Sequence, residues 1–298
     1  MKPLNVIRNM PGGFTLILGL IVFGFQGCGG GSSSPSTSTS STPTAVTPPA
    51  FPLVALGDKR YLQDQNAVPF PILGRTAWFI TSLSETGYKI FIDDTVAKGY
   101  NAIEFHVVNH DPQGNNPPFG FGGNNALALP FTERLDHLPW YGSLSYGIIK
   151  NEAPNFSLPN ETYWKHVDVL LAYAESKGVL CFMFPAYAGY AGTDQGWMVE
   201  MVANGPLNMQ TYGAFIANRY KARGNIVWML GGDYGTGGNS FTAEELAVEQ
   251  AMLVGMQSAL QGQVGVNFSA EWNMDSIYTD QTDPTLQSAG TLQGGTCQ

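Results

Sequence analysis

The chain has 298 residues, of which 44% are hydrophobic and 12% are charged. This composition is typical of a folded globular protein and excludes a chain that is disordered throughout. With 14 Lys and Arg against 23 Asp and Glu, the formal net charge is −9, so nucleic acid is not an expected partner. Three cysteines and four histidines, without a CxxC or HExxH motif, exclude a disulfide scaffold and the common metal motifs, and no cofactor is expected.

The N-terminus has the pattern of an export signal. Lys2 and Arg8 precede an apolar run, Phe14 to Phe25, which is shorter than the roughly 20 residues that a spanning helix needs. The run ends near Gly27-Cys28, which resembles the lipobox of bacterial lipoproteins. We therefore expect residues 1–28 to be a signal peptide and Cys28 to be lipidated, with the protein exported and anchored in a membrane. An ordinary secretory signal with an unmodified Cys28 is the alternative.

Residues 29–50 are rich in Gly, Ser, Thr and Pro and show no apolar periodicity. Such a segment cannot bury enough surface to fold, and it is predicted to be a flexible linker. No similar segment recurs later, so residues 51–298 are predicted to form one domain.

From residue 51 onward, amphipathic helical patterns alternate with apolar strand patterns. Each helical pattern closes on a glycine after a long polar side chain, which suits a left-handed residue at a helix end. These junctions are Lys98-Gly99, Lys177-Gly178, Arg223-Gly224 and Gln261-Gly262. The predicted strands that follow are Ala102–Val108, Val179–Pro185, Ile226–Leu230 and Val264–Ser269. Because these runs are apolar throughout, both faces of the sheet are expected to be covered and the strands to be parallel.

Three further features complete the element prediction. A run around Trp78 predicts an earlier strand, preceded by a β-hairpin from Tyr61 to Leu73. The segment Thr242-Ala243-Glu244-Glu245 predicts a capping box at a helix start. Cys181 falls inside a predicted strand and is expected to be a buried thiol, with a disulfide to Cys297 as the alternative.

Such a pattern fits either a doubly wound sheet or a (β/α)₈ barrel. A doubly wound nucleotide-binding sheet would carry GxGxxG or GxxxxGK[ST] after its first strand, and neither motif stands there. Long functional connections follow the carboxyl ends of barrel strands, and the segment from Asn109 to about Asn160 is one. We therefore predict an α/β fold, a (β/α)₈ TIM-type barrel with about five of the eight βα units visible and an N-terminal β-hairpin.

Two carboxylates stand at predicted carboxyl ends of strands. Asp233 closes the run from Ile226, behind two glycines that allow a ligand to approach closely, and it is a candidate general acid. Glu271 closes the next run, and two carboxylates on neighbouring strands are the minimum for glycoside hydrolysis. Each has a structural alternative, because Asp233 could cap the following turn and Glu271 could pair with a cation such as Arg75.

Aromatic and polar side chains gather at the same predicted strand ends. Flat apolar rings offer a stacking surface for sugars. The candidate substrate-binding residues are Trp78, Asn109, His110, Tyr187, Trp228 and Trp272. We expect Asn109 and His110 to hydrogen-bond a polar ligand and His106 to be a core histidine. A metal held by His106, His110 and Asp111 would lack a fourth ligand, so no metal is expected.

Several segments resemble, in the same order, the apiosidase-like glycoside hydrolases, a bacterial family with a (β/α)₈ barrel. The resemblance runs from about Arg60 to Glu271. Its segments include Leu73 to Trp78, Ala97 to Ile103, Trp164 to Asp168, Asn218 to Tyr220 and, most specifically, Asn225 to Asp233. The resemblance implies that Asp233 is the catalytic acid/base and that the substrate is a pectic side chain, cut at or beside apiose.

Two positions depart from the family pattern. Arg75 stands where the family has an aspartate in a Gly-Asp-Thr-x-Trp turn, which would place a positive charge near the mouth of the first strand. The family's second catalytic carboxylate is a glutamate on a later strand than any that can be aligned. The barrel is therefore expected to be C-terminally incomplete in this chain, with Glu271 as the candidate nucleophile or substrate ligand.

These observations predict a membrane-anchored glycoside hydrolase that acts on the side chains of plant or other complex polysaccharides. It would stand on the periplasmic or cell-surface side. Two alternatives remain open: a non-catalytic glycan-binding surface lipoprotein, and an inactive fragment of a longer hydrolase.

Overall fold

The computed structural model describes residues 47–55, 62–110, 129–140, 152–189, 196–232, 241–261 and, for the backbone alone, 267–270. All of them fall in the unit Val46–Gln298. The predicted signal peptide, Cys28 and most of the predicted linker lie outside the described residues. Within the described part of the chain, no helix has the length and apolar character needed to cross a bilayer.

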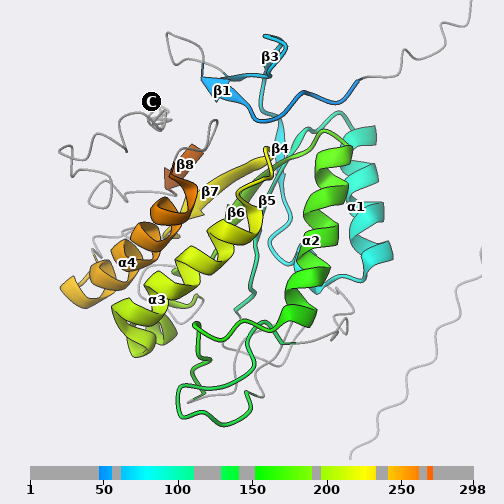
Figure 1. Ribbon diagram of the computed structural model, residues 1–298. Coiled ribbons are helices and arrows are strands. Elements are labelled where there is room, and N and C mark those ends of the chain that lie inside the picture. The colour runs from blue at the N-terminus through cyan, green and yellow to red at the C-terminus, as the bar shows by residue number, and fades with distance from the viewer. Residues whose placement is uncertain are drawn as a thin grey trace, which may run out of the picture. The chain divides into compact units, whose positions relative to one another are not determined.

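Among the described residues, five parallel strands form the main sheet, and they are ordered in space as they are along the chain (Figure 1). They are β4 (Gly74–Thr76), β5 (Ala102–His106), β6 (Leu180–Phe184), β7 (Ile226–Leu230) and β8 (Asn267–Ala270). A doubly wound sheet reverses its strand order at a switch point. Here each strand pairs with the next one, which is the order of a TIM-type barrel. The predicted fold class is confirmed, with five strands visible.

In the described part of the chain, one α-helix lies between each pair of successive strands and packs on the outer face of the sheet (Figure 1). The helices are α1 (Glu85–Ala97), α2 (Glu161–Ser176), α3 (Met198–Tyr220) and α4 (Ala243–Leu260). The short 3₁₀ helix η1 (Ile80–Ser82) precedes α1. The predicted capping box is confirmed, because the Thr242 side chain accepts from the Glu245 N–H and the Glu245 carboxylate accepts from the Thr242 N–H.

A small antiparallel sheet closes one end of the barrel interior. It consists of β1 (Val54–Ala55), β2 (Leu62–Gln63) and β3 (Pro69–Phe70), so the predicted hairpin is confirmed and carries one extra strand. Its Leu62 and Phe70 share a buried cluster with Ala102 and Leu180, the first residues of β5 and β6. Because this sheet covers the amino ends of the strands, the carboxyl ends are left for a site.

The domain begins earlier than the composition predicts. Pro49 packs on the main body so closely that a Cβ at Gly178 would lie 2.6 Å from its Cδ. The Ala50 N–H donates to the Asp64 carboxylate at 3.0 Å. The predicted linker boundary at residue 50 is therefore too late, since Pro-rich composition does not show whether a segment docks.

The structure requires glycine at the helix–strand junctions for two different reasons. Gly99 and Gly178 have φ values of 83° and 73°, so the predicted left-handed helix ends are confirmed there. Gly224 does not have a positive φ, so the left-handed helix end that was predicted there is wrong. A Cβ at Gly224 would lie 2.7 Å from the Pro52 nitrogen, so the N-terminal segment requires glycine there by close approach. Gly262 lies outside the described residues.

The described parts of the long connection after β5 pack against α3. Isolated bridges pair Phe131 with Pro159 and Arg134 with Pro154. Asn204 of α3 accepts from the Phe156 N–H at 2.9 Å and donates to the Pro154 carbonyl at 2.9 Å. These contacts fix the connection beside the carboxyl ends of the strands.

Candidate active site

Three stacked rings lie at the carboxyl ends of the first three barrel strands. Trp78 follows β4 by two residues, His106 is the last residue of β5, and Tyr187 follows β6 by three residues. The Trp78 and His106 rings are 5.9 Å apart at an interplanar angle of 10°, and the His106 and Tyr187 rings are 4.3 Å apart at 14°. We call these three side chains the aromatic row. The structure thus brings together two of the predicted sugar-stacking residues, joined by a histidine.

The row ends at the backbone that follows β7. A Cβ at Gly232 would lie 2.8 Å from the Tyr187 ring and 2.9 Å from the Gly189 carbonyl oxygen. The preceding Gly231 has a φ of 81°, which a larger residue rarely adopts. The two glycines were expected to admit a ligand. In the structure, the Tyr187 ring packs against Gly232, and Gly232 is the residue before Asp233 in the chain.

Burial determines the protonation state of His106. Its side chain lies between the two flat rings and also meets the Phe184 edge at 5.6 Å. Burial, with a smaller contribution from nearby His110, lowers the pKa of His106 to about 3. His106 is therefore neutral at physiological pH and serves as a stacking ring, which confirms its prediction as a core histidine.

Asn109 holds the strand ends together. With the amide oriented to satisfy every neighbour, its Nδ2 donates to the Trp78 carbonyl at 3.1 Å and the His106 carbonyl at 3.3 Å. Its Oδ1 then accepts from the Thr81 and Ser82 hydroxyls at 3.0 and 2.7 Å. The side chain is 2% exposed. The predicted contact with a polar ligand is therefore corrected: the amide is occupied in fixing β4, β5 and η1.

His110 lies beside the first turn of α3. Its Nε2 lies 3.3 Å from the Glu200 Oε2, in the first turn of α3, and its ring meets Trp197 edge to face at 4.6 Å. Both side chains are buried. His110 therefore contacts α3, and its hydrogen bond to a ligand stays a prediction.

Two residues point to the helices rather than to the interior. Trp228 is 2% exposed and belongs to the cluster under the helices, so its ring cannot offer a face to a sugar. Arg75 lies 4.3 Å above the Phe91 ring and pairs with Asp94 at 2.9 Å, both on α1. The expected positive charge at the mouth of the first strand is thus corrected, because alternate residues of a strand face opposite sides.

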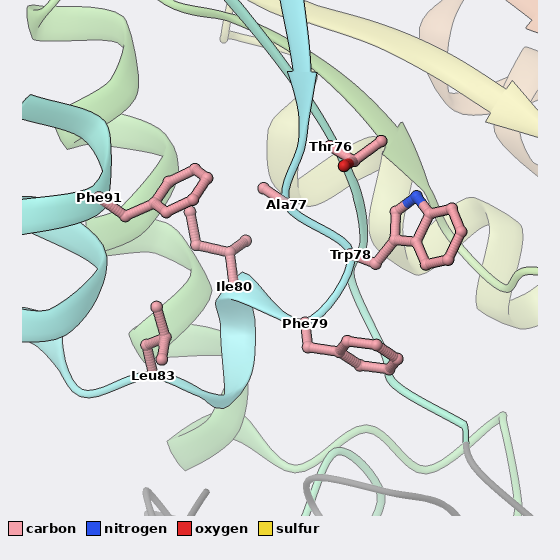
Figure 2. A pocket seen from close by; sticks show the side chains of 7 residues that line it. All are labelled: Thr76, Ala77, Trp78, Phe79, Ile80, Leu83 and Phe91. Atoms are coloured by element: carbon pink, nitrogen blue, oxygen red, sulfur yellow. The ribbon is translucent and has the colours of Figure 1, made fainter. Parts of the chain in front are cut away.

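An apolar pocket of about 200 Å³ adjoins the row. Figure 2 shows Phe91 of α1 on one side of the β4 backbone, with the rings of Trp78 and Phe79 projecting away from α1. Its lining residues are Thr76, Ala77, Trp78, Phe79, Ile80, Leu83 and Phe91. Trp78 is 42% exposed, so its indole is reachable from solvent.

Several predicted site residues lie outside the described residues. They are Cys28, Asp111, Asp233, Glu271, Trp272 and Cys297. Cys181 is a free, buried thiol whose pKa is raised by burial. Among the described His, Cys, Asp and Glu residues, no three converge as a metal site would require.

The structure adds one carboxylate that the sequence prediction did not use. Glu104 of β5 lies two residues before His106, on the interior side, and pairs in register with Thr76 and Phe182. The only signal for it was a charged residue inside an otherwise apolar strand. In the structure Glu104 is half-buried, between the buried residues Ile103 and Phe105.

Comparisons with known proteins agree with this architecture. The family model "Apiosidase-like, catalytic domain" matches residues 57–283. A sequence comparison with curated proteins found no match.

Solved structures of similar fold include three glycoside hydrolases or candidates. A family 5 glycoside hydrolase from Bacteroides vulgatus is 22% identical with a TM-score of 0.49, over 73% of this chain and 39% of that protein. A candidate glycoside hydrolase from the same organism is 12% identical with a TM-score of 0.51, over 74% of this chain and 38% of that protein. An endo-1,4-β-mannanase from Rhizomucor miehei is 11% identical with a TM-score of 0.43, over 70% of this chain and 58% of that protein.

At these identities the structural likeness concerns the fold alone, and the chain spans less than two thirds of the length of each of these proteins. The family match has a wider basis, since it covers residues 57–283 of the 298. Together with the sequential parallel order of β4 to β8, it shows that this chain belongs to the apiosidase-like catalytic domain family.

Proposed function

We propose that this protein is a glycoside hydrolase that cleaves side chains of pectic or other complex plant polysaccharides, with Asp233 as the acid/base. The observation that carries the proposal is the aromatic row, which crosses the carboxyl ends of β4, β5 and β6 and ends against Gly232. The rings occupy one another's facing sides, so the exposed end ring, Trp78, is the one that offers a flat, uncharged face to the apolar side of a sugar. Asp233 is the next residue after Gly232, so a proton donor at that position would act beside the row.

Glu271 is proposed as the second carboxylate. The last residue of β8, Ala270, pairs with Leu230 at the end of β7. Asp233 and Glu271 therefore follow neighbouring strands within three residues of their ends. Glycoside hydrolysis needs one group that protonates the leaving oxygen and one that attacks the sugar or activates water.

Full-length protein incubated with an apiose-bearing pectic polysaccharide is expected to release a free sugar, detected by anion-exchange chromatography. A mannan and a xylan, incubated in parallel, test whether the substrate is another glycan. Saturable binding without release of product from any of them would contradict hydrolysis and favour a non-catalytic glycan-binding protein.

We further propose that the protein is exported and held at a membrane by a lipid on Cys28. The charged and apolar pattern before Cys28 and the linker after it support this location. In a bacterial host, Cys28→Ser is expected to move the protein from the membrane fraction to the soluble fraction and to abolish labelling by radioactive palmitate. Unchanged fractionation and labelling of the variant would contradict the anchor.

A further inference from the structure

The outer end of the aromatic row carries an exposed tryptophan. The tryptophans of the described core, Trp140, Trp164, Trp197 and Trp228, are at most 2% exposed, whereas Trp78 is 42% exposed. Burial is the ordinary state of a residue with so much apolar surface. The exposure of Trp78, at a strand end and beside a pocket of about 200 Å³, therefore marks a surface able to receive an apolar group.

The orientation of this indole is fixed on one side. The Trp78 ring is stacked on His106 at an interplanar angle of 10°, so one face is occupied by the row and the other faces away from it. The Asn109 amide donates to the carbonyls of both Trp78 and His106, which fixes the backbone that carries the two rings. An aromatic platform with few conformations to lose binds its ligand at a lower entropic cost.

We propose that the outer face of Trp78 is a sugar-binding subsite that stacks on the C–H face of a substrate residue other than the one whose bond is cleaved. This inference rests on the proposed function. Two ring spacings separate Trp78 from Tyr187, the ring that touches Gly232. A small glycoside at the reacting centre would not extend over both positions, whereas an oligosaccharide would. The subsite thus selects oligosaccharide side chains over small glycosides.

The ligand chemistry follows from the surroundings of Trp78. The adjoining pocket is lined almost entirely by apolar side chains, and His106 behind the indole is neutral. An uncharged sugar face fits such a surface, since stacking on an aromatic ring needs no charge on the ligand. Asn109 is the positioning residue of this subsite, because it touches the backbone of Trp78 rather than the ligand.

The test compares Trp78→Ala and Trp78→Phe on two probes, an apiose-bearing pectic oligosaccharide and para-nitrophenyl apioside. For Trp78→Ala we expect the KM for the oligosaccharide to rise about tenfold, which corresponds to the loss of one aromatic stacking contact. The loss should be several-fold smaller for the small glycoside. Trp78→Phe keeps a flat ring and is expected to recover most of the affinity. Ile90→Ala, which removes an exposed apolar side chain of α1, is the matched control.

Binding is measured separately from cleavage. Calorimetric titration of the full-length protein with the oligosaccharide gives an affinity whether or not product forms, and melting curves of all variants verify folding. Weaker binding by Trp78→Ala without cleavage by any variant would leave the subsite in place and contradict the hydrolase. Cleavage with equal affinity in wild type and Trp78→Ala, or an equal loss on both probes, would overturn the subsite and leave the hydrolase in place.

Discussion

Asp233→Asn is expected to lower kcat on a pectic polysaccharide about a thousandfold, within the range for removal of a general acid. The asparagine cannot donate a proton to the leaving oxygen, although it has nearly the same size as aspartate. The melting temperature should change little. Initial rates of sugar release, measured at saturating polysaccharide, provide the comparison.

Two controls separate the loss of a proton donor from a general defect. When the substrate is an aryl glycoside with an acidic phenol, the phenolate departs without protonation. The loss of kcat on that substrate should therefore be much smaller. Asp93→Asn removes a carboxylate of α1 that pairs with Lys177, away from the strand ends, and should retain wild-type rates. Full polysaccharide cleavage by Asp233→Asn would exclude Asp233 from the mechanism.

Glu249→Gln is expected to stabilise the protein by about 3 kcal/mol at pH 7 and to have little effect near pH 4. Glu249 lies in α4 with 0% exposure, and neither carboxylate oxygen has a hydrogen-bond partner. Burial raises the pKa of Glu249 to about 8, from 4.5. The folded state therefore holds a proton that the unfolded state releases between these pH values, and stability falls as the pH rises through this window.

Urea unfolding of both proteins at several pH values between 4 and 8 measures the difference. The advantage of Glu249→Gln should grow steadily above pH 4.5 and level off near pH 8. Gln250→Ala, an exposed change at the next position of the same helix that removes no titrating group, should show no such trend. A constant difference between wild type and Glu249→Gln at all pH values would contradict a proton held by Glu249.

The strands and helices could be predicted because their signals are local. The run Ile226–Leu230 is apolar at every position, and the structure has a strand with the same bounds. The capping box at Thr242 and the glycine after Lys98 are likewise read from a few adjacent residues. Such signals depend on backbone geometry, which neighbouring residues largely decide.

The orientation of side chains could not be predicted in the same way. A strand buried on both faces is apolar at odd and even positions alike, so its sequence does not show which parity faces the interior. For this reason the sequence predicts Trp228 as a substrate-binding residue, although its side chain faces the helices. The role of Asn109 depends on carbonyls of Trp78 and His106, which only the fold brings together.

The most direct test of the proposed hydrolase is cleavage of the pectic polysaccharide in water enriched in ¹⁸O, with mass analysis of the released sugar. Hydrolysis by the full-length protein should place one ¹⁸O atom at the anomeric carbon of the product, and Asp233→Asn should release little or none. A product that lacks ¹⁸O and carries a new double bond would indicate elimination instead. That result, or binding of the polysaccharide without any release, would contradict the proposal that this apiosidase-like domain is a glycoside hydrolase.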